Sequence, residues 1–343
     1  MDAAVASERR ELAFAGVARQ AALVRAGEVS PRELVEASLE RIRTLDADLN
    51  AFRAVFAERA LAEVEEATAR LTAGDQAPLL GVPIAIKDDQ RVAGTPLVWG
   101  SNAHGDPEPE DSEVVHRLRR AGAIVIGVTR TPELTIWPFT ETAAGGITRN
   151  PWDLQRTPGG SSGGAGAAVA AGLVPAATAS DGAGSIRIPA ACCGLFGLKP
   201  QRGRVSLLPR TEAWYGLSVP GFLTRTVADS ALLYEAVTDQ PFVAAAAREP
   251  GRLRIALALK LPPGIVARVD PEWRGAAQRT AEVLRDLGHE VVEREVDYGP
   301  RVIADFLVRN FAGIHEAAGD MPHPERLERR TRAMARLGAL ARP

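Results

Sequence analysis

Two glycine-rich segments that each carry serine constrain the fold of this chain more than any other feature. The first is Pro158-Gly159-Gly160-Ser161-Ser162-Gly163-Gly164, and the second is Asp181-Gly182-Ala183-Gly184-Ser185-Ile186-Arg187. Glycine lets the backbone turn sharply and approach a reacting group closely. The run between the two segments is rich in alanine, as is typical of a helix. Serine in such turns indicates either a flexible linker or nucleophile and oxyanion-hole chemistry.

Short apolar runs alternate with helical patterns along most of the chain. Buried strands are predicted at residues 78–86, 123–127, 173–179, 253–259 and 290–296. Helices are predicted from a capping box at Ser30 to about residue 45, at residues 51–71, 112–121, 165–171, 226–237 and 270–288, and from about residues 302 and 325. The alternation predicts an α/β layered fold with a substantially parallel sheet.

The composition excludes some classes of function. Of the 343 residues, 46% are hydrophobic and 24% charged, and the net charge of −2 gives no support for nucleic-acid binding. No basic region followed by an apolar core opens the chain, and no run approaches about 18 apolar residues, so we expect neither a secretory signal nor a spanning helix. The only cysteines, Cys192 and Cys193, are adjacent in an apolar stretch and indicate a reducing compartment. We expect a cytoplasmic protein without nucleic-acid or membrane partners.

Lysine is rare in this chain. Of 41 basic residues, only Lys87, Lys199 and Lys260 are lysine. Lysine offers an amine that burial can deprotonate, which arginine does not. Lys87 follows the apolar run at residues 78–86, where desolvation is expected. Lys199 is interpreted as structural and Lys260 as a surface residue.

Four interpretations of the first glycine-serine segment were compared. A phosphate-binding loop requires a lysine after the glycines, and the Rossmann pattern requires G-x-G-x-x-G after a strand; both fail here. The G-x-S-x-G elbow of α/β-hydrolases matches residues 159–163, although no strand precedes it and neither His289 nor His315 is well placed as a partner. A flexible linker is disfavoured because the segment runs directly into the Ala-rich helix. The elbow and the linker remain open alternatives.

The same segments resemble the amidase signature family. The motifs that carry the resemblance are the two glycine-serine segments, Gly81-Val82-Pro83-Ile84-Ala85-Ile86-Lys87-Asp88, and Cys193-Gly194-Leu195-Phe196-Gly197-Leu198-Lys199-Pro200. The resemblance extends over roughly residues 10–300. It implies one amidase domain over residues 1–343, with a central mixed, mostly parallel sheet covered by helices on both faces. Within it we expect N-terminal helices at 8–72, a catalytic core at 78–240 and a C-terminal α/β portion at 250–343.

The resemblance assigns a Ser–cis-Ser–Lys triad to three residues. Ser185 matches the nucleophile, Ser161 the bridging serine after a cis peptide bond, and Lys87 the base. The chemistry of the residues agrees, because a serine hydroxyl is a weak nucleophile until a base takes its proton. A hydroxyl both donates and accepts, so Ser161 is able to pass that proton on to a neutral Lys87.

The resemblance also assigns residues around the triad. The oxyanion hole is expected from the backbone amides of Gly182, Ala183, Gly184 and Ser185. Four further residues match supporting positions, with ordinary loop and helix-end hydrogen bonding as the alternative: Thr157, Ser162, Asp181 and Arg187. No metal or organic cofactor is implied, and the histidines lack the spacing of zinc ligands. Trp137, Trp152 and Trp214 are expected in the core or in a pocket wall.

Two features depart from the family pattern. The family has two glycines before the nucleophile, whereas this chain has Ala183-Gly184, so a positive φ at position 183 would be strained. Family members also continue beyond the position of Pro343, so we expect the C-terminal portion to be incomplete.

These observations predict an amidase that hydrolyses a small carboxylic amide through a seryl acyl-enzyme, releasing an acid and ammonia or an amine. Two alternatives remain. One is the A subunit of a glutamyl-tRNA amidotransferase, and the other is a catalytically inactive amidase-like binding subunit. The expected partner is a small-molecule amide, and a homodimer is left open.

Overall fold

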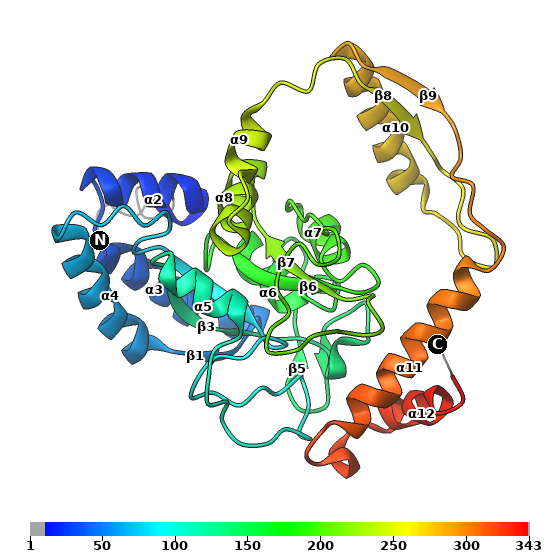
Figure 1. Cartoon of the computed structure of the whole chain (residues 1–343), viewed down its shortest axis with the longest axis horizontal. Helices are drawn as coiled ribbons and strands as arrows, with labels where there is room; N and C mark the ends of the chain where they lie inside the picture. Colours follow the sequence, from blue (N-terminus) through cyan, green and yellow to red (C-terminus); the bar gives the residue numbers. More distant parts are fainter. Residues whose placement is uncertain (1–10, 342–343) are drawn as a thin grey trace.

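A mixed five-stranded sheet forms the centre of the computed structural model, which describes residues 11–341 (Figure 1). The strands follow the order β1-β3-β2-β6-β7. Their bounds are β1 Phe52–Val55, β2 Pro83–Lys87, β3 Ile124–Thr129, β6 Ala177–Asp181 and β7 Val219–Leu223. The three inner strands β3, β2 and β6 are parallel, while β1 and β7 run antiparallel to their neighbours at the two edges. The expected parallel arrangement therefore holds for the centre of the sheet.

Helices cover both faces of this sheet. Successive residues of β2 point to opposite sides, so Ala85 packs with one apolar cluster and Ile84 and Ile86 pack with another. The first cluster includes residues of α3 (Pro31–Leu49), α4 (Ala57–Thr72) and α6 (Gly163–Ala170). The second includes residues of α2 (Gly16–Ala26), α5 (Glu113–Arg120) and α8 (Val227–Thr238). Burial on both faces explains why the strand sequences are continuously apolar.

The start of α3 confirms the capping box predicted at Ser30. The Ser30 side chain accepts from the Glu33 backbone amide at 3.2 Å, and the Glu33 carboxylate accepts from the Ser30 amide at 2.7 Å. The helix predicted over residues 51–71 is wrong at its beginning. Residues 52–55 form β1 instead, because their backbone pairs with β3; α4 begins only at Ala57.

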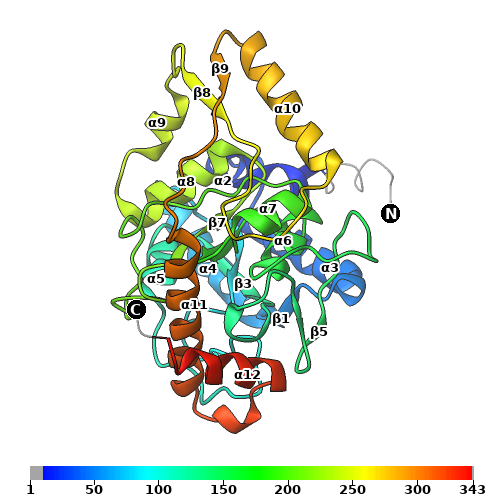
Figure 2. The same cartoon turned by 90° about the vertical axis from the view of Figure 1, so that its right-hand side faces the viewer.

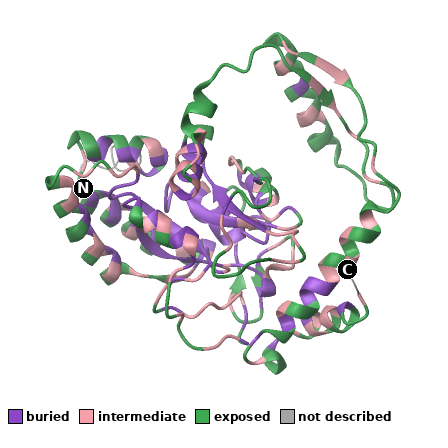
Figure 3. Ribbon diagram, viewed as in Figure 1, coloured by how far each residue is buried: buried purple, intermediate pink, exposed green. Residues whose placement is uncertain are grey.

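A second unit, which we call the outer unit, lies apart from the central sheet. It contains β8 (Arg254–Leu257), α10 (Pro271–Asp286) and β9 (Glu290–Glu293), with the two strands parallel. Figures 1 and 2 show that extended segments connect this unit to α9 (Phe242–Ala247) on one side and to α11 (Val302–Gly319) on the other. Its surface is largely exposed, whereas the central sheet is almost entirely buried (Figure 3).

After the outer unit, the chain returns to the region of the central sheet. Helices α11 and α12 (Arg329–Gly338) pack against each other, and α11 contacts the short helix η1 (Glu133–Thr135). The remaining elements are α7 (Arg187–Cys193), the hairpin of β4 (Glu141–Thr142) and β5 (Gly146–Ile147), and η2 (Pro324–Arg326). Among the described helices, none combines the length and the apolar character needed to span a bilayer.

Candidate active site

The candidate site lies where two inner strands end. Lys87 is the last residue of β2, and Asp181 is the last residue of β6. Because β2 and β6 are parallel, their carboxyl ends meet at the same edge of the sheet. The first glycine-serine segment reaches this edge just before α6, and the peptide bond between Gly160 and Ser161 is cis, as the resemblance implies.

Lys87 is held by three polar neighbours. Its amine Nζ donates to the Ser161 hydroxyl at 2.9 Å and to the Ser180 hydroxyl at 2.7 Å. The same Nζ lies 3.1 Å from Asp89 Oδ2. Ser180 in turn donates to Asp89, so Ser180 and Asp89 together fix the amine opposite Ser161.

Burial determines the protonation of Lys87. The side chain is fully shielded from solvent, and this desolvation lowers the pKa of the Lys87 amine below its ordinary value. The negative charges of Asp89 and Asp181 act in the opposite direction without cancelling the effect of burial. The lowered pKa brings the amine closer to the neutral form that a general base requires.

Ser185 shares a cavity with Ser161. Both serines line a cavity of about 270 Å³, which we call the seryl cavity, and Ser185 is half-buried there. The Ser162 amide donates to the Ser185 carbonyl oxygen at 3.3 Å, which joins the two glycine-serine segments. Within residues 11–341, no direct hydrogen bond joins the hydroxyls of Ser161 and Ser185. Such bonds are often long in unliganded enzymes and tighten with substrate.

Asp181 shapes the loop that carries Ser185. Its carboxylate accepts from the Gly184 amide at 2.7 Å and forms two bonds of 2.9 Å with the Arg187 guanidinium. Weaker bonds come from the backbone amides of Ile186 and Arg187, at 3.3 and 3.4 Å. Burial by itself would raise the pKa of Asp181, but the hydrogen bonds from Arg187 and Gly184 lower it overall. An ionised Asp181 thus fixes the conformation of the loop by accepting hydrogen bonds from the backbone amides of that loop.

Four backbone amides are expected in the oxyanion hole, and one of them has a protein acceptor in this structure. The Gly184 amide is already occupied by Asp181. Among the described residues, no protein acceptor engages the amides of Gly182, Ala183 and Ser185, so these three are free to face a ligand. Ala183 is exposed and has no positive φ, whereas Gly184 has φ 120°. The glycine therefore stands where the backbone requires it, and Ala183 is not strained.

Two of the four supporting residues act on the backbone of the loops. The Thr157 hydroxyl accepts from the Gly159 amide at 3.1 Å, just before the cis bond. The buried Ser162 hydroxyl donates to the Ser180 carbonyl oxygen and accepts from the Ser180 amide, both at 3.4 Å. These contacts fit the alternative of ordinary loop hydrogen bonding. The other two, Asp181 and Arg187, form the ion pair described above.

The walls of the seryl cavity combine apolar and polar side chains. Trp137 and Trp214 line the cavity together with Ile188 and with Phe306 of α11. These two tryptophans are therefore in a pocket wall, which was one of the two places expected for them. Trp152 differs, because 75% of it is exposed and its indole donates to the Cys193 carbonyl oxygen. An aliphatic or aromatic group fits such walls better than a charged one.

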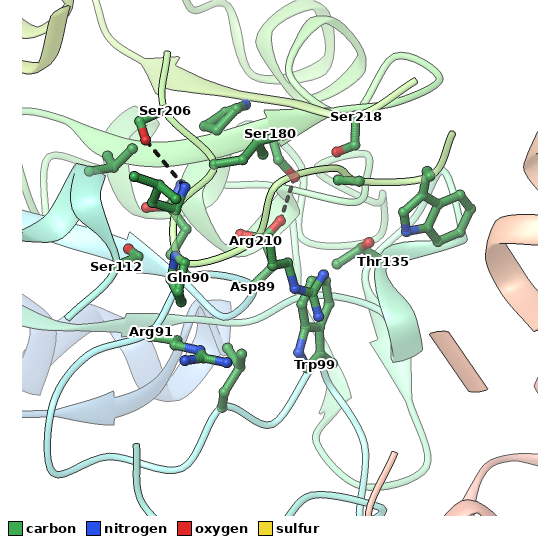
Figure 4. A pocket seen from close by; sticks show the side chains of 18 residues that line it. Asp89, Gln90, Arg91, Trp99, Ser112, Thr135, Ser180, Ser206, Arg210 and Ser218 are labelled. Atoms are coloured by element: carbon green, nitrogen blue, oxygen red, sulfur yellow. Dashed lines mark hydrogen bonds between the residues drawn. The ribbon is translucent and has the colours of Figure 1, made fainter. Parts of the chain in front are cut away.

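Ser180 and Asp89 are functional candidates that the sequence did not single out. Their only signals were their positions, directly before Asp181 and two residues after Lys87. Both also line a second, adjacent cavity with Arg210 and Trp99, which Figure 4 shows. Asp88 lies between Lys87 and Asp89 in the sequence. It instead forms an ion pair of 3.1 Å with Arg53 of β1.

In the part of the chain from residue 11 to residue 341, no group of three or more His, Cys, Asp or Glu side chains is placed to hold a metal ion.

Comparison with known proteins shows the family of the chain. The family model described as Amidase matches residues 33–322. A protein of Mycobacterium tuberculosis named as an amidase, AmiB2, is 55% identical over 334 residues, which cover 96% of this chain and 72% of the relative. A solved structure of 6-aminohexanoate cyclic dimer hydrolase with its substrate superposes with a TM-score of 0.86 at 31% identity, covering 96% of this chain and 72% of that one.

A second solved structure, a bacterial aryl acylamidase of the amidase signature enzymes, superposes with a TM-score of 0.84 at 27% identity, covering 96% of this chain and 73% of that one. Family model, sequence relatives and structural neighbours thus agree. This chain belongs to the amidase signature family and is an amidohydrolase.

Proposed function

We propose that Lys87, Ser161 and Ser185 hydrolyse a small carboxylic amide through a seryl acyl-enzyme. The observation that carries this proposal is the buried amine of Lys87, which lies 2.9 Å from the Ser161 hydroxyl. Ser161 and Ser185 line the same cavity. A desolvated amine supplies the base, and the intervening hydroxyl supplies the path for the proton.

Acylation begins when Ser185 Oγ bonds to the carbonyl carbon of the substrate. The proton of Ser185 moves to Ser161 Oγ, and the proton of Ser161 moves to Lys87 Nζ. The carbonyl oxygen becomes an oxyanion, for which we propose the amides of Gly182, Ala183 and Ser185 as donors. Preorganised donors of this kind each contribute about 3 kcal/mol to the stability of the transition state.

Collapse of the tetrahedral intermediate breaks the carbon–nitrogen bond. The ammonium of Lys87 returns its proton through Ser161 to the leaving nitrogen, so ammonia or a neutral amine departs. Water then attacks the acyl carbon, and its proton passes through Ser161 to Lys87. The bond from the acyl carbon to Ser185 Oγ breaks as this proton returns through Ser161 to Ser185 Oγ, and the acid is released. The base and both hydroxyls end the cycle in their starting protonation states.

Turnover of a panel of aliphatic, aryl and amino-acid amides tests this function. Ser185→Ala should reduce hydrolysis to background, because it removes the proposed nucleophile. Ser218→Ala is the matched control, since Ser218 lines the seryl cavity but makes no hydrogen bond to Lys87 in the described structure. Full activity of Ser185→Ala would refute the proposal.

The two alternatives predict different outcomes in the same experiment. An inactive binding subunit would be well folded and would hydrolyse none of the amides. An amidotransferase A subunit would hydrolyse glutamine and would copurify with partner chains.

The adjacent, unpaired thiols of Cys192 and Cys193 support the further proposal of a reducing, cytoplasmic location.

A further inference from the structure

The cavity beside the seryl cavity, which we call the polar cavity, has the construction of a binding site. It encloses about 70 Å³ and shares four lining residues with the seryl cavity: Thr135, Ser180, Trp214 and Ser218. In Figure 4 Asp89 and Ser180 lie between this shared wall, at Ser218 and Thr135, and the opposite end at Gln90 and Ser112. A group bound here would therefore be adjacent to the reacting serines.

Four buried polar atoms without partners belong to residues that line the polar cavity. They are Asp89 Oδ1, both amide atoms of Gln90 and the Ser112 hydroxyl, none of which has a hydrogen-bond partner within the described residues. The Asp89 side chain is only 5% exposed. Buried polar groups are nearly always hydrogen-bonded, so a cluster of unsatisfied ones around one cavity indicates a polar ligand.

The charges of the cavity restrict what that ligand is. Arg210 also lines it, with its guanidinium 4.6 Å from the ring centroid of Trp99. Asp89 is the carboxylate with the largest electrostatic effect on Arg210, yet within the described chain the two side chains do not approach to an ion pair of 4.0 Å. Asp89, whose Oδ1 has no partner among the described residues, and the exposed residue Arg210 thus line the same small space with opposite charges. Arg91, also in the lining, is neutralised by Glu108 at 3.1 Å.

An uncharged dipolar group fits these charges better than an ion. A ligand carboxylate would meet the charge of Asp89, and a ligand ammonium would meet that of Arg210. In the proposed mechanism Lys87 is the neutral base, and the charges of Asp89 and Arg210 then balance each other. A secondary amide presents an N–H on one side and a carbonyl oxygen on the other, and its few atoms suit the size of the cavity.

We infer that the polar cavity is a substrate subsite for a second amide group, with its N–H donating to Asp89 and its carbonyl oxygen accepting from Arg210. This inference rests on the proposed amide hydrolysis at Ser185. It names the substrate class as carboxylic amides that carry another amide close to the scissile one, such as amides of N-acylated amino acids.

Three primary amides of similar length test the subsite. N-acetylglycinamide has the second amide, levulinamide replaces its N–H by CH2, and pentanamide lacks both polar groups. We expect kcat/KM to fall about tenfold or more at each step, because a site built for hydrogen bonds is left unpaired by the poorer substrate. Arg210→Met should lower kcat/KM about tenfold for the first two substrates and leave pentanamide nearly unchanged.

Arg156→Met is the control, because this exposed arginine is paired with Asp153 and lines neither cavity, and it should alter all three substrates alike. Equal kcat/KM for the three substrates, or equal losses in Arg210→Met, would show that the cavity holds water only. In that outcome hydrolysis of pentanamide still supports the proposed function. If no substrate is hydrolysed, calorimetric binding to Ser185→Ala decides the subsite: N-acetylglycinamide must bind more tightly than levulinamide, and equal binding overturns the inference.

Discussion

The central sheet and the unit of β8, α10 and β9 differ in how much of their side-chain surface is covered. Every residue of β2 and β3 is buried, whereas Ala281 is the one buried residue within α10, and β8 and β9 have none. The side chains that bind the Lys87 amine come from the covered region and the loops that follow its strands. Catalysis requires groups held to a fraction of an ångström, and packing on both faces of a sheet supplies that restraint.

The outer unit nevertheless has a structural connection to the site. It is followed by α11, whose Phe306 and Asn310 line the seryl cavity. The covered region therefore holds the reacting groups, while the C-terminal segment supplies part of the wall. Substitutions in the two regions should have very different consequences.

Lys87→Met should have the largest effect, because it removes the base from the covered region. We expect kcat/KM to fall about a thousandfold or more, in the range that general-base catalysis contributes. The measurement is steady-state hydrolysis of the best amide in the panel. Lys87→Met combined with Asp89→Asn removes the buried pair together and controls for loss of folding. Retention of full activity by the folded single variant would remove Lys87 from the mechanism.

The matched pair Ile84→Ala and Val283→Ala tests the difference in packing directly. Ile84 of β2 is 1% exposed, and its truncation should lower the free energy of unfolding by about 3 kcal/mol. Val283 of α10 is 56% exposed, and its truncation should change that free energy by about 0.5 kcal/mol or less. Urea unfolding measures both. Similar losses would mean that the outer unit is packed as well as the sheet.

Asp181→Asn should weaken the loop that carries Ser185. It removes the charge from a carboxylate with five donors, so we expect the free energy of unfolding to fall by about 2 kcal/mol at neutral pH. Folding lowers the pKa of Asp181, so this stabilisation is complete above its ordinary pKa and is lost as the pH falls through the folded value. A wild-type advantage that does not shrink in acid would contradict this account.

Asp89→Asn should have the smallest effect, a shift in the pH profile. The Asp89 charge favours the ammonium form of Lys87, so its removal should lower the pKa of Lys87 further. The acid limb of kcat/KM should consequently move to lower pH. The other charge acting on Lys87, that of Asp181, stays in place. An unmoved limb would show that Asp89 only positions the amine.

Local sequence signals predicted much of the central region. The apolar runs before Lys87 and Asp181 became β2 and β6, and the motif residues Lys87 and Ser161 do meet although they are 74 positions apart. Motif resemblance was needed for that pairing, because no local pattern brings together two positions so distant in the chain.

Elements that depend on distant partners were not predicted. Residues 52–55 have a helical neighbourhood and become strand β1 only by pairing with β3. Strand β7 contains Pro220 and Gly221, which are unusual inside a strand but tolerated at the sheet edge that β7 occupies. Asp89 and Arg210 come from segments 121 residues apart, so their shared cavity is visible only in the folded chain.

The most direct measurement is to map where a fluorophosphonate probe attaches. Mass spectrometry of digested protein should locate the adduct on Ser185 in the wild type and in Ser161→Ala, at a slower rate in the variant, and should find none in Ser185→Ala. An adduct on Ser161, or an unlabelled but folded wild type, would contradict a nucleophile at Ser185 served by Lys87 through Ser161.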